Sequence, residues 1–130
     1  MGFILLIIAK VLSWILFPIG WMYSLITFRL KLSRLNEYAF TIALSLDQLG
    51  NVVLANIMND FLIKSEGYKF GNPDDTISAV IGVNKLKGTL LPAGKAISYI
   101  LNKVDNNHVE KASKNIILFL IIVVFSSFVI

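Results

Sequence analysis

The strongest constraint on the fold is an apolar stretch at the N-terminus. Residues 2–28 contain one charged side chain, that of Lys10, and a helix needs about 20 predominantly apolar residues to cross a bilayer. A cleaved signal peptide begins with positive charge and ends in small residues, whereas this stretch begins uncharged and ends in bulky residues. We therefore expect a retained transmembrane helix over 3–28. It should kink at Pro18, because proline removes a backbone hydrogen bond.

Lys10 is the unusual residue of this stretch. Its ammonium group could line a polar path through the membrane. Alternatively, the span begins near Val11, and the long side chain of Lys10 extends to the lipid headgroups. We expect the second arrangement.

The C-terminus is also apolar. Residues 115–130 carry no charged side chain, but a helix of this length is shorter than the ~30 Å hydrocarbon core. Two lysines just before the stretch could extend to the headgroups. In addition, Asn107 followed three residues later by Glu110 is typical of a capping box, which would start the helix at His108. We therefore expect a second transmembrane helix over 115–130.

Almost all charged residues lie between the two apolar ends. Residues 29–114 hold eleven of the twelve lysines and arginines and all eight acids, and the basic run RLKLSR at 29–34 directly follows the first apolar stretch. Cytoplasmic segments next to transmembrane helices carry an excess of Lys and Arg. We expect residues 29–114 to form a cytoplasmic or interfacial helical domain, with both chain ends on the other side of the membrane.

Residues 37–63 form another long apolar stretch. Its polar residues share one stripe of a helix, because Asp47, Asn51 and Asn59 recur at multiples of four, with Ser45 and Gln48 beside them. If this stretch crossed the membrane, the eight lysines that follow it would lie outside, against the charge rule. We expect an interfacial or bundle-packed helix, and a third span is the alternative.

The composition excludes several classes of function. The chain is 56% hydrophobic with a mean hydropathy of +0.75, whereas soluble domains are about 45–50% apolar. The net charge is +4, but single lysines interleaved with acids favour anionic lipid, at ~1 kcal/mol per cation, over nucleic acid. The absence of cysteine excludes disulfides, Cys-ligated zinc and thiol catalysis. No Gly-rich phosphate loop, G-x-S-x-G or H-E-x-x-H motif is present.

Two shorter helices follow in the central segment. Asp74 and Asp75 are good N-cap residues for the first helix, and Pro92 suits the first turn of the second. No period-two alternation indicates strands, so the fold class is all-α. Each helix has an expected apolar face: Ile77, Val80 and Ile81 on the first, and Ile97, Ile100, Leu101 and Val104 on the second.

Three polar clusters lie in the same segment: LDQLGN, GNPDDTIS and DNNH. Their order and spacing over residues 43–112 resemble a group of small proteins encoded by phages and prophages, which carry D-Q-x-x-N, [PA]-D-E-T-[IL]-S and D-x-x-H motifs. Asp75 stands where the group has Glu, and Val109 stands where it often has Cys, which argues against a thiol-based role. The resemblance implies a location in a bacterial inner membrane. The matching residues are Asp47, Gln48 and Asn51; Asp74, Thr76, Ile77 and Ser78; and Asp105 and His108.

We expect these polar residues to hold the small helical domain together. The members of this predicted latch are Asp47, Gln48, Asn51, Asp74, Asp75, Thr76, Ser78, Asp105 and His108. One alternative is that Asp47, Asp75 and His108 hold a divalent cation such as Mg²⁺ or Mn²⁺, or act as acid and base in hydrolysis. Another is that the polar residues form a surface that binds a partner. No serine has a histidine beside it in sequence, so a Ser-His-Asp triad is not predicted, and no cofactor is expected.

The function expected from these patterns is that of a small, non-enzymatic phage-type accessory protein at the host inner membrane, acting in lysis, penetration or exclusion. One alternative is a membrane-anchored hydrolase or metal-dependent enzyme using Asp47, Asp75 and His108. Another is a holin-like pore, although Lys10 and Ser13 are the only polar residues that would face its lumen. The expected partners are the lipid bilayer and a membrane protein or further copies of this chain, and no nucleic acid.

Overall fold

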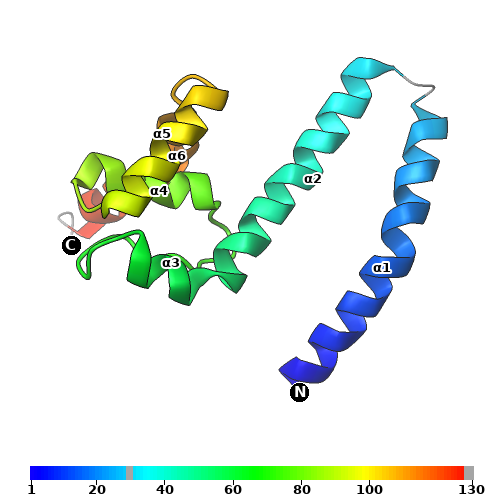
Figure 1. The fold of residues 1–130 in the computed structure, drawn as a ribbon, viewed down its shortest axis with the longest axis horizontal. Coiled ribbons are helices and arrows are strands. Elements are labelled where there is room, and N and C mark those ends of the chain that lie inside the picture. The colour runs from blue at the N-terminus through cyan, green and yellow to red at the C-terminus, as the bar shows by residue number, and fades with distance from the viewer. Residues whose placement is uncertain (29–30, 128–130) are drawn as a thin grey trace. The chain divides into compact units, whose positions relative to one another are not determined.

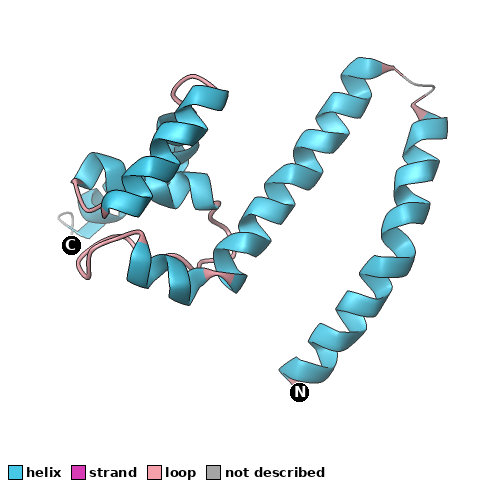
Figure 2. Ribbon diagram, viewed as in Figure 1, coloured by secondary structure: helices cyan, strands magenta, loops and turns pink. Residues whose placement is uncertain are grey.

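The computed structural model describes residues 1–28 and 31–127, with the backbone alone for 125–127. Arg29 and Leu30 of the basic run, and residues 128–130 of the predicted C-terminal span, lie outside the described residues. Helices joined by loops account for the described fold, as Figures 1 and 2 show, so the all-α class is confirmed. The helices are α1 (Gly2–Thr27), α2 (Leu32–Val53), α3 (Ala55–Phe61), α4 (Ile77–Lys87), α5 (Pro92–Val104) and α6 (His108–Ser127).

The chain divides into two compact units, Met1–Ile42 and Ala43–Ile130. In the first unit, α1 contacts the beginning of α2 through aromatic rings. The ring of Tyr38 lies 5.8 Å from that of Trp21 and 5.8 Å from that of Phe28. Aromatic pairs at this spacing add about 0.5–1.5 kcal/mol each to the area they bury.

Apart from Lys10, the side chains of helix α1 suit an apolar environment. It is long and apolar enough to cross a membrane, it runs without a break through Pro18, and none of its residues is buried by the rest of the chain. The hydroxyl groups of Ser13, Ser24 and Thr27 each donate to the carbonyl four residues earlier. Hydroxyl groups satisfied in this way need no water, which a bilayer core does not supply.

The long apolar stretch at 37–63 forms two helices rather than one. Helix α2 ends at Val53 and α3 starts at Ala55, with a 72° bend between them. By length and composition, this pair could form a second span in the described part of the chain only if the two bent helices acted as one. Helix α6 does not meet the same criteria within the described residues, since Glu110, Lys111 and Lys114 occupy its first two turns. The C-terminal span over 115–130 stays a prediction.

Helix α4 lies at the centre of the second unit. All seven residues from 78 to 84 are buried, including Val80 and Ile81 of the predicted apolar face. They are buried all round because α4 packs against both α5 and α6 and against the 62–70 segment, which contributes Leu62, Ile63 and Phe70 to the same core. Backbone hydrogen bonds between residues 62–64 and 89–91 close the loop that follows α4.

Glycine permits the closest approach between α4 and α6. A Cβ atom added at Gly82 would lie 2.0 Å from the carbonyl oxygen of Val109 and 2.8 Å from the Cβ of Ser113. Further along the pair, Ile116 of α6 packs against Ala79 and Val83 of α4. Helix α6 therefore uses part of its apolar surface inside the helical unit and continues without a break past residue 114.

The predicted apolar face of α5 is half wrong. Ile97 and Leu101 pack against the core as expected, but Ile100 is 58% exposed and Val104 is 84% exposed. The buried face instead passes through Gly94 and Ser98. Small residues are needed there, because a Cβ at Gly94 would lie 2.3 Å from the carbonyl oxygen of Leu62.

Replacing Ser98 tests this packing. Ser98 is 2% exposed, and its hydroxyl group has no hydrogen-bond partner. Because an unpaired buried hydroxyl is unfavourable, we expect Ser98→Ala to leave the free energy of unfolding unchanged or raise it by about 1 kcal/mol. Ser113 is the control, since its buried hydroxyl donates to the carbonyl of Glu110 at 2.9 Å, so Ser113→Ala should lower stability by ~1 kcal/mol. Equal losses in chemical denaturation would contradict the described environment of Ser98.

Both predicted N-caps need correction. Thr76, not Asp74 or Asp75, caps α4, because its hydroxyl accepts from the N–H of Ala79 at 3.1 Å. Helix α6 begins at His108 as predicted, but Asn107 has a left-handed backbone with φ 57°, whereas a side-chain N-cap usually has extended backbone. The carboxylate of Glu110 accepts hydrogen bonds from the side chain of Asn102 instead.

Candidate functional site

The predicted latch joins α2 to the loop before α4. The side-chain amide of Gln48 donates to the carbonyl of Asp74 at 3.1 Å. The amide of Asn51, which is fully buried, donates to the carbonyls of Asn72 at 2.8 Å and Asp75 at 3.0 Å. The bond to the Asp75 carbonyl is buried, so it replaces the water that this loop carbonyl loses on folding, whereas the bond to the Asp74 carbonyl lies at the surface. Gln48 and Asn51 of the predicted polar stripe therefore bind backbone.

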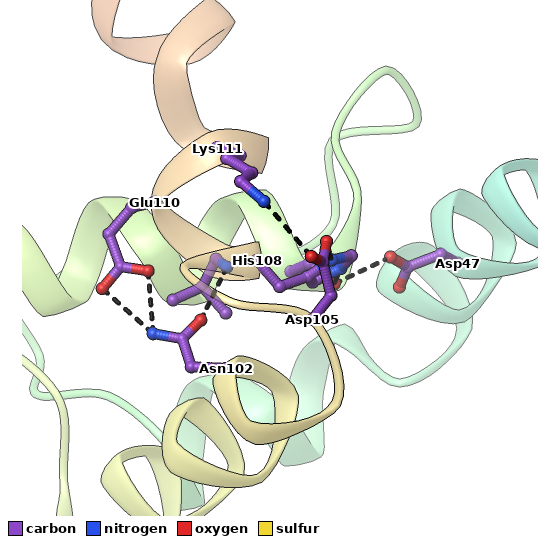
Figure 3. A network of polar contacts seen from close by, with 8 residues as sticks. Asp47, Asn102, Asp105, His108, Glu110 and Lys111 are labelled. Carbon is purple, nitrogen blue, oxygen red and sulfur yellow. Dashed lines mark hydrogen bonds and ion pairs between the residues drawn. The ribbon is translucent and has the colours of Figure 1, made fainter.

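A second line of contacts runs through side chains (Figure 3). The carboxylate of Asp47 accepts from the N–H of Ile77 at 3.2 Å and from the hydroxyl of Ser78 at 3.1 Å. The same hydroxyl lies 3.2 Å from Nε2 of His108, and Nδ1 of this ring is 3.1 Å from the carboxylate of Asp105. The chain Asp47, Ser78, His108 and Asp105 therefore links α2, α4 and the start of α6.

Three residues of this series of contacts are arranged in the order of a catalytic triad. In a triad, the imidazole contacts the serine through one nitrogen and an acid through the other, as Ser78, His108 and Asp105 do here. However, Ser78 is 5% exposed, and its hydroxyl group already donates to the Asp47 carboxylate at 3.1 Å. A carboxylate at that position would also repel an oxyanion that formed beside the serine.

Asp75 makes different contacts from Asp47 and His108. Its carboxylate accepts from the hydroxyl of Tyr68 at 2.8 Å and from the amide of Asn72 at 3.0 Å. Burial, together with the hydrogen bond to Asp75, raises the pKa of the Tyr68 phenol, so this hydroxyl stays a donor. In the described part of the chain, no three Asp, Glu or His side chains are grouped so that they could hold a metal ion.

Asn102 fixes the start of α6 in place of the predicted capping box. Its side-chain oxygen accepts from the N–H of Val109 at 3.0 Å, and its amide donates to both carboxylate oxygens of Glu110, at 3.1 and 2.8 Å (Figure 3). Lys85 of α4 forms an ion pair with the same carboxylate. These bonds join α4, α5 and α6 at one place.

Two carboxylates of this region have altered acidity. Hydrogen bonds from Lys85 and Asn102 hold the pKa of Glu110 below its usual value. Those from His108 and Lys111 do the same for the pKa of Asp105. A lowered pKa means that these contacts stabilise the fold above the ordinary carboxyl pKa and are lost as the pH falls through the lowered one.

The predicted latch left out two asparagines that organise the core, Asn84 and Asn59. Asn84 is fully buried and binds both the N–H and the carbonyl of Tyr68, each at 2.8 Å, and also the hydroxyl of Thr89 at 2.6 Å. Asn59 similarly binds the N–H and the carbonyl of Phe70, at 2.9 and 3.2 Å. An Asn among apolar helix residues is a signal that could have indicated Asn84, but its partners are distant in sequence.

Comparison with known proteins gives no match: no family model, no curated protein and no solved structure is significantly similar to this chain. The structure itself defines the class, an all-helical protein with an N-terminal helix long and apolar enough to cross a membrane. The resemblance to phage-encoded proteins stays a prediction.

Proposed function

We propose that this protein is a small, non-enzymatic accessory protein anchored in a bacterial inner membrane. Helix α1 and the apolar end of α6 are its anchors, and the helical domain between them lies in the cytoplasm. In keeping with the resemblance to phage proteins, its process is lysis, penetration or exclusion at the host membrane. The lipid bilayer is one partner, and a membrane protein or a further copy of the chain is the other.

One observation carries the non-enzymatic assignment: apart from that of Asp74, the side chains of the predicted latch contact each other or the surrounding fold. Asp47, Gln48 and Asn51 all bind the 72–78 segment. Asp75 binds Tyr68 and Asn72. Side chains used in this way hold a fold together and leave little free for substrate.

Cysteine labelling tests the anchoring, since the chain has no native cysteine. Ser65 and Val104 are exposed residues of the helical domain, so cysteine there can react without disturbing the core. We expect Gly2→Cys to react with a membrane-impermeant thiol reagent in intact cells, and Ser65→Cys and Val104→Cys to react only after permeabilisation. Labelling of the last two in intact cells would contradict a cytoplasmic domain.

Substitution of Asp75 separates a latch from a metal site. Asp75→Asn keeps one acceptor for Tyr68, whereas Asp75→Ala loses both hydrogen bonds and should lower the free energy of unfolding by about 1–3 kcal/mol. We therefore expect Ala to lower the melting temperature more than Asn, with no effect of added Mg²⁺ or Mn²⁺. A metal-dependent rise in the melting temperature of the wild type that both variants lose would contradict the latch and support a metal-dependent enzyme.

A membrane-anchored serine hydrolase is the second candidate, favoured by the geometry of Ser78, His108 and Asp105. In that reaction, Ser78 Oγ would bond to a substrate carbonyl carbon while His108 took the hydroxyl proton and passed it to the leaving group. Asp47 would first have to move from Ser78. A fluorophosphonate probe that labels the wild type but not Ser78→Ala would establish this candidate, and absence of labelling in both would support the non-enzymatic function.

A further inference from the structure

An apolar groove runs between the C-terminal half of α4 and the apolar part of α6. Its volume is about 370 Å³, and it is lined by Val83, Leu86, Lys87, Ile117, Leu120, Ile121 and Val124. Small-molecule sites have volumes of about 300–1,000 Å³ and mostly apolar walls. The groove is therefore large enough for part of an extended ligand.

Water is a poor occupant of this groove. An ordered water needs about two to four polar partners, and Lys87 supplies the one charged group among the lining side chains. Six aliphatic side chains form the rest of the wall. A flexible hydrocarbon chain would remove this apolar surface from water without leaving a polar group unpaired.

Lys87 places a positive charge at the wall of the groove. Its ammonium lies 5.7 Å from the ring centroid of Tyr68, which positions it. Lys85 and Lys111 form ion pairs with Glu110 and Asp105, whereas Lys87 has no acidic partner among the described residues. Its charge is therefore available to an anion beside a hydrocarbon chain.

Helix α6 also carries exposed apolar residues outside the groove. Leu118, Phe119 and Ile122 of α6 are exposed on the same helix but do not line the groove. This helix contains the predicted C-terminal span, so in a membrane the groove would open where acyl chains are present. The positive charge and the apolar wall match the two parts of one ligand class.

We propose that the α4–α6 groove binds one acyl chain of an anionic phospholipid, with the lipid phosphate paired to Lys87. The proposal rests on the membrane location given under the proposed function. It adds a defined lipid site in the helical domain, distinct from the general contact of an anchor with the bilayer. Bound lipid would fill the gap between the two helices and keep the C-terminal half of α4 beside the first half of the predicted span.

Tryptophan quenching in the full chain tests the site. Both native tryptophans, Trp14 and Trp21, lie in α1 and are replaced by Phe. Leu86→Trp then reports on the groove, and Leu118→Trp, on the exposed surface of α6, is its control. When phosphatidylglycerol with brominated acyl chains is titrated into detergent-solubilised protein, quenching of Leu86→Trp should saturate at about one lipid per chain. Quenching of Leu118→Trp should rise linearly, and identical linear curves would overturn the proposal.

Charge dependence tests the role of Lys87. Phosphatidylglycerol should bind about fivefold more tightly than phosphatidylcholine, and Lys87→Gln should remove this preference. Lys114→Gln is the matched control, because Lys114 is an exposed lysine of α6 outside the groove, and it should retain the preference. Equal effects of the two substitutions would overturn the pairing of phosphate with Lys87.

Two further experiments distinguish the possible failures. Crosslinking tests whether the groove is a protein interface, and membrane extraction tests whether the protein is anchored at all. If a second copy of the chain occupies the groove, Leu86→Cys will form disulfide-linked dimers even in excess lipid, and the lipid site is wrong. If alkaline carbonate extracts the wild type from membranes, the proposed anchoring fails. Retention in membranes without saturable quenching overturns the lipid site alone.

Discussion

Gly82→Ala is expected to destabilise the helical unit by about 3 kcal/mol or more, at the upper end of overpacking effects. The added Cβ would lie 2.0 Å from the Val109 carbonyl oxygen and 2.8 Å from the Val109 carbonyl carbon. These are backbone atoms, which cannot change rotamer to make room. Alanine favours a helix over glycine by roughly 1 kcal/mol. A net loss of stability would therefore show that the steric cost of the added Cβ between α4 and α6 is larger than the gain in helix propensity.

Gly88→Ala is the matched control. Gly88 ends α4 with a left-handed φ of 68°, and a Cβ there would meet open space. This variant should lose only the cost of placing alanine in that conformation, about 1–2 kcal/mol. Urea denaturation followed by far-UV circular dichroism in mild detergent measures both variants. A Gly82→Ala protein as stable as the wild type would contradict the described packing of α4 on α6.

Local sequence patterns predicted the helices well. The apolar run of α1 and the position of Pro92 in the first turn of α5 depend on neighbouring residues alone, and the structure has both. The face of α5 was predicted incorrectly because periodicity finds large apolar residues, whereas the closest contact of this helix needs Gly94 and Ser98. The break at Leu54 has no proline or glycine within three residues on either side to indicate it.

The polar site depends on contacts that a single sequence does not contain. The three motifs supplied the correct residues for the contacts of Asp47, Ser78 and His108, but these partners are 30 and 31 positions apart. Asn102 and Glu110 illustrate the same difficulty at a shorter distance. Glu110 matched the pattern of a capping box, yet Asn102, on the preceding helix, supplies the hydrogen bond to the first turn of α6. At the start of α6, the contacts with the preceding helix therefore replace the local hydrogen bonds of a capping box.

Among substitutions that almost preserve the shape of the side chain, Asn84→Asp should lower the stability of the fold the most. The Asn84 amide donates to the carbonyls of Tyr68 at 2.8 Å and Val80 at 2.9 Å. A carboxylate would place a charged oxygen against two carbonyl oxygens in a site with no exposed surface. An uncompensated buried charge typically costs about 3–5 kcal/mol, so we expect a loss of that size at neutral pH.

The pH dependence of this loss identifies its cause. Burial and the two carbonyls should raise the pKa of the introduced carboxyl group in the folded state. A raised pKa means that the variant gains stability relative to the wild type as the pH falls, and loses it as the pH rises through that pKa. Asn84→Ala removes the same hydrogen bonds without adding a titratable group, so its deficit should not change between pH 5 and pH 8, values chosen to lie on either side of a raised carboxyl pKa. Denaturation of both variants and the wild type at the two pH values measures the difference, and a pH-independent deficit for Asn84→Asp would show that the Asn84 site is open to water.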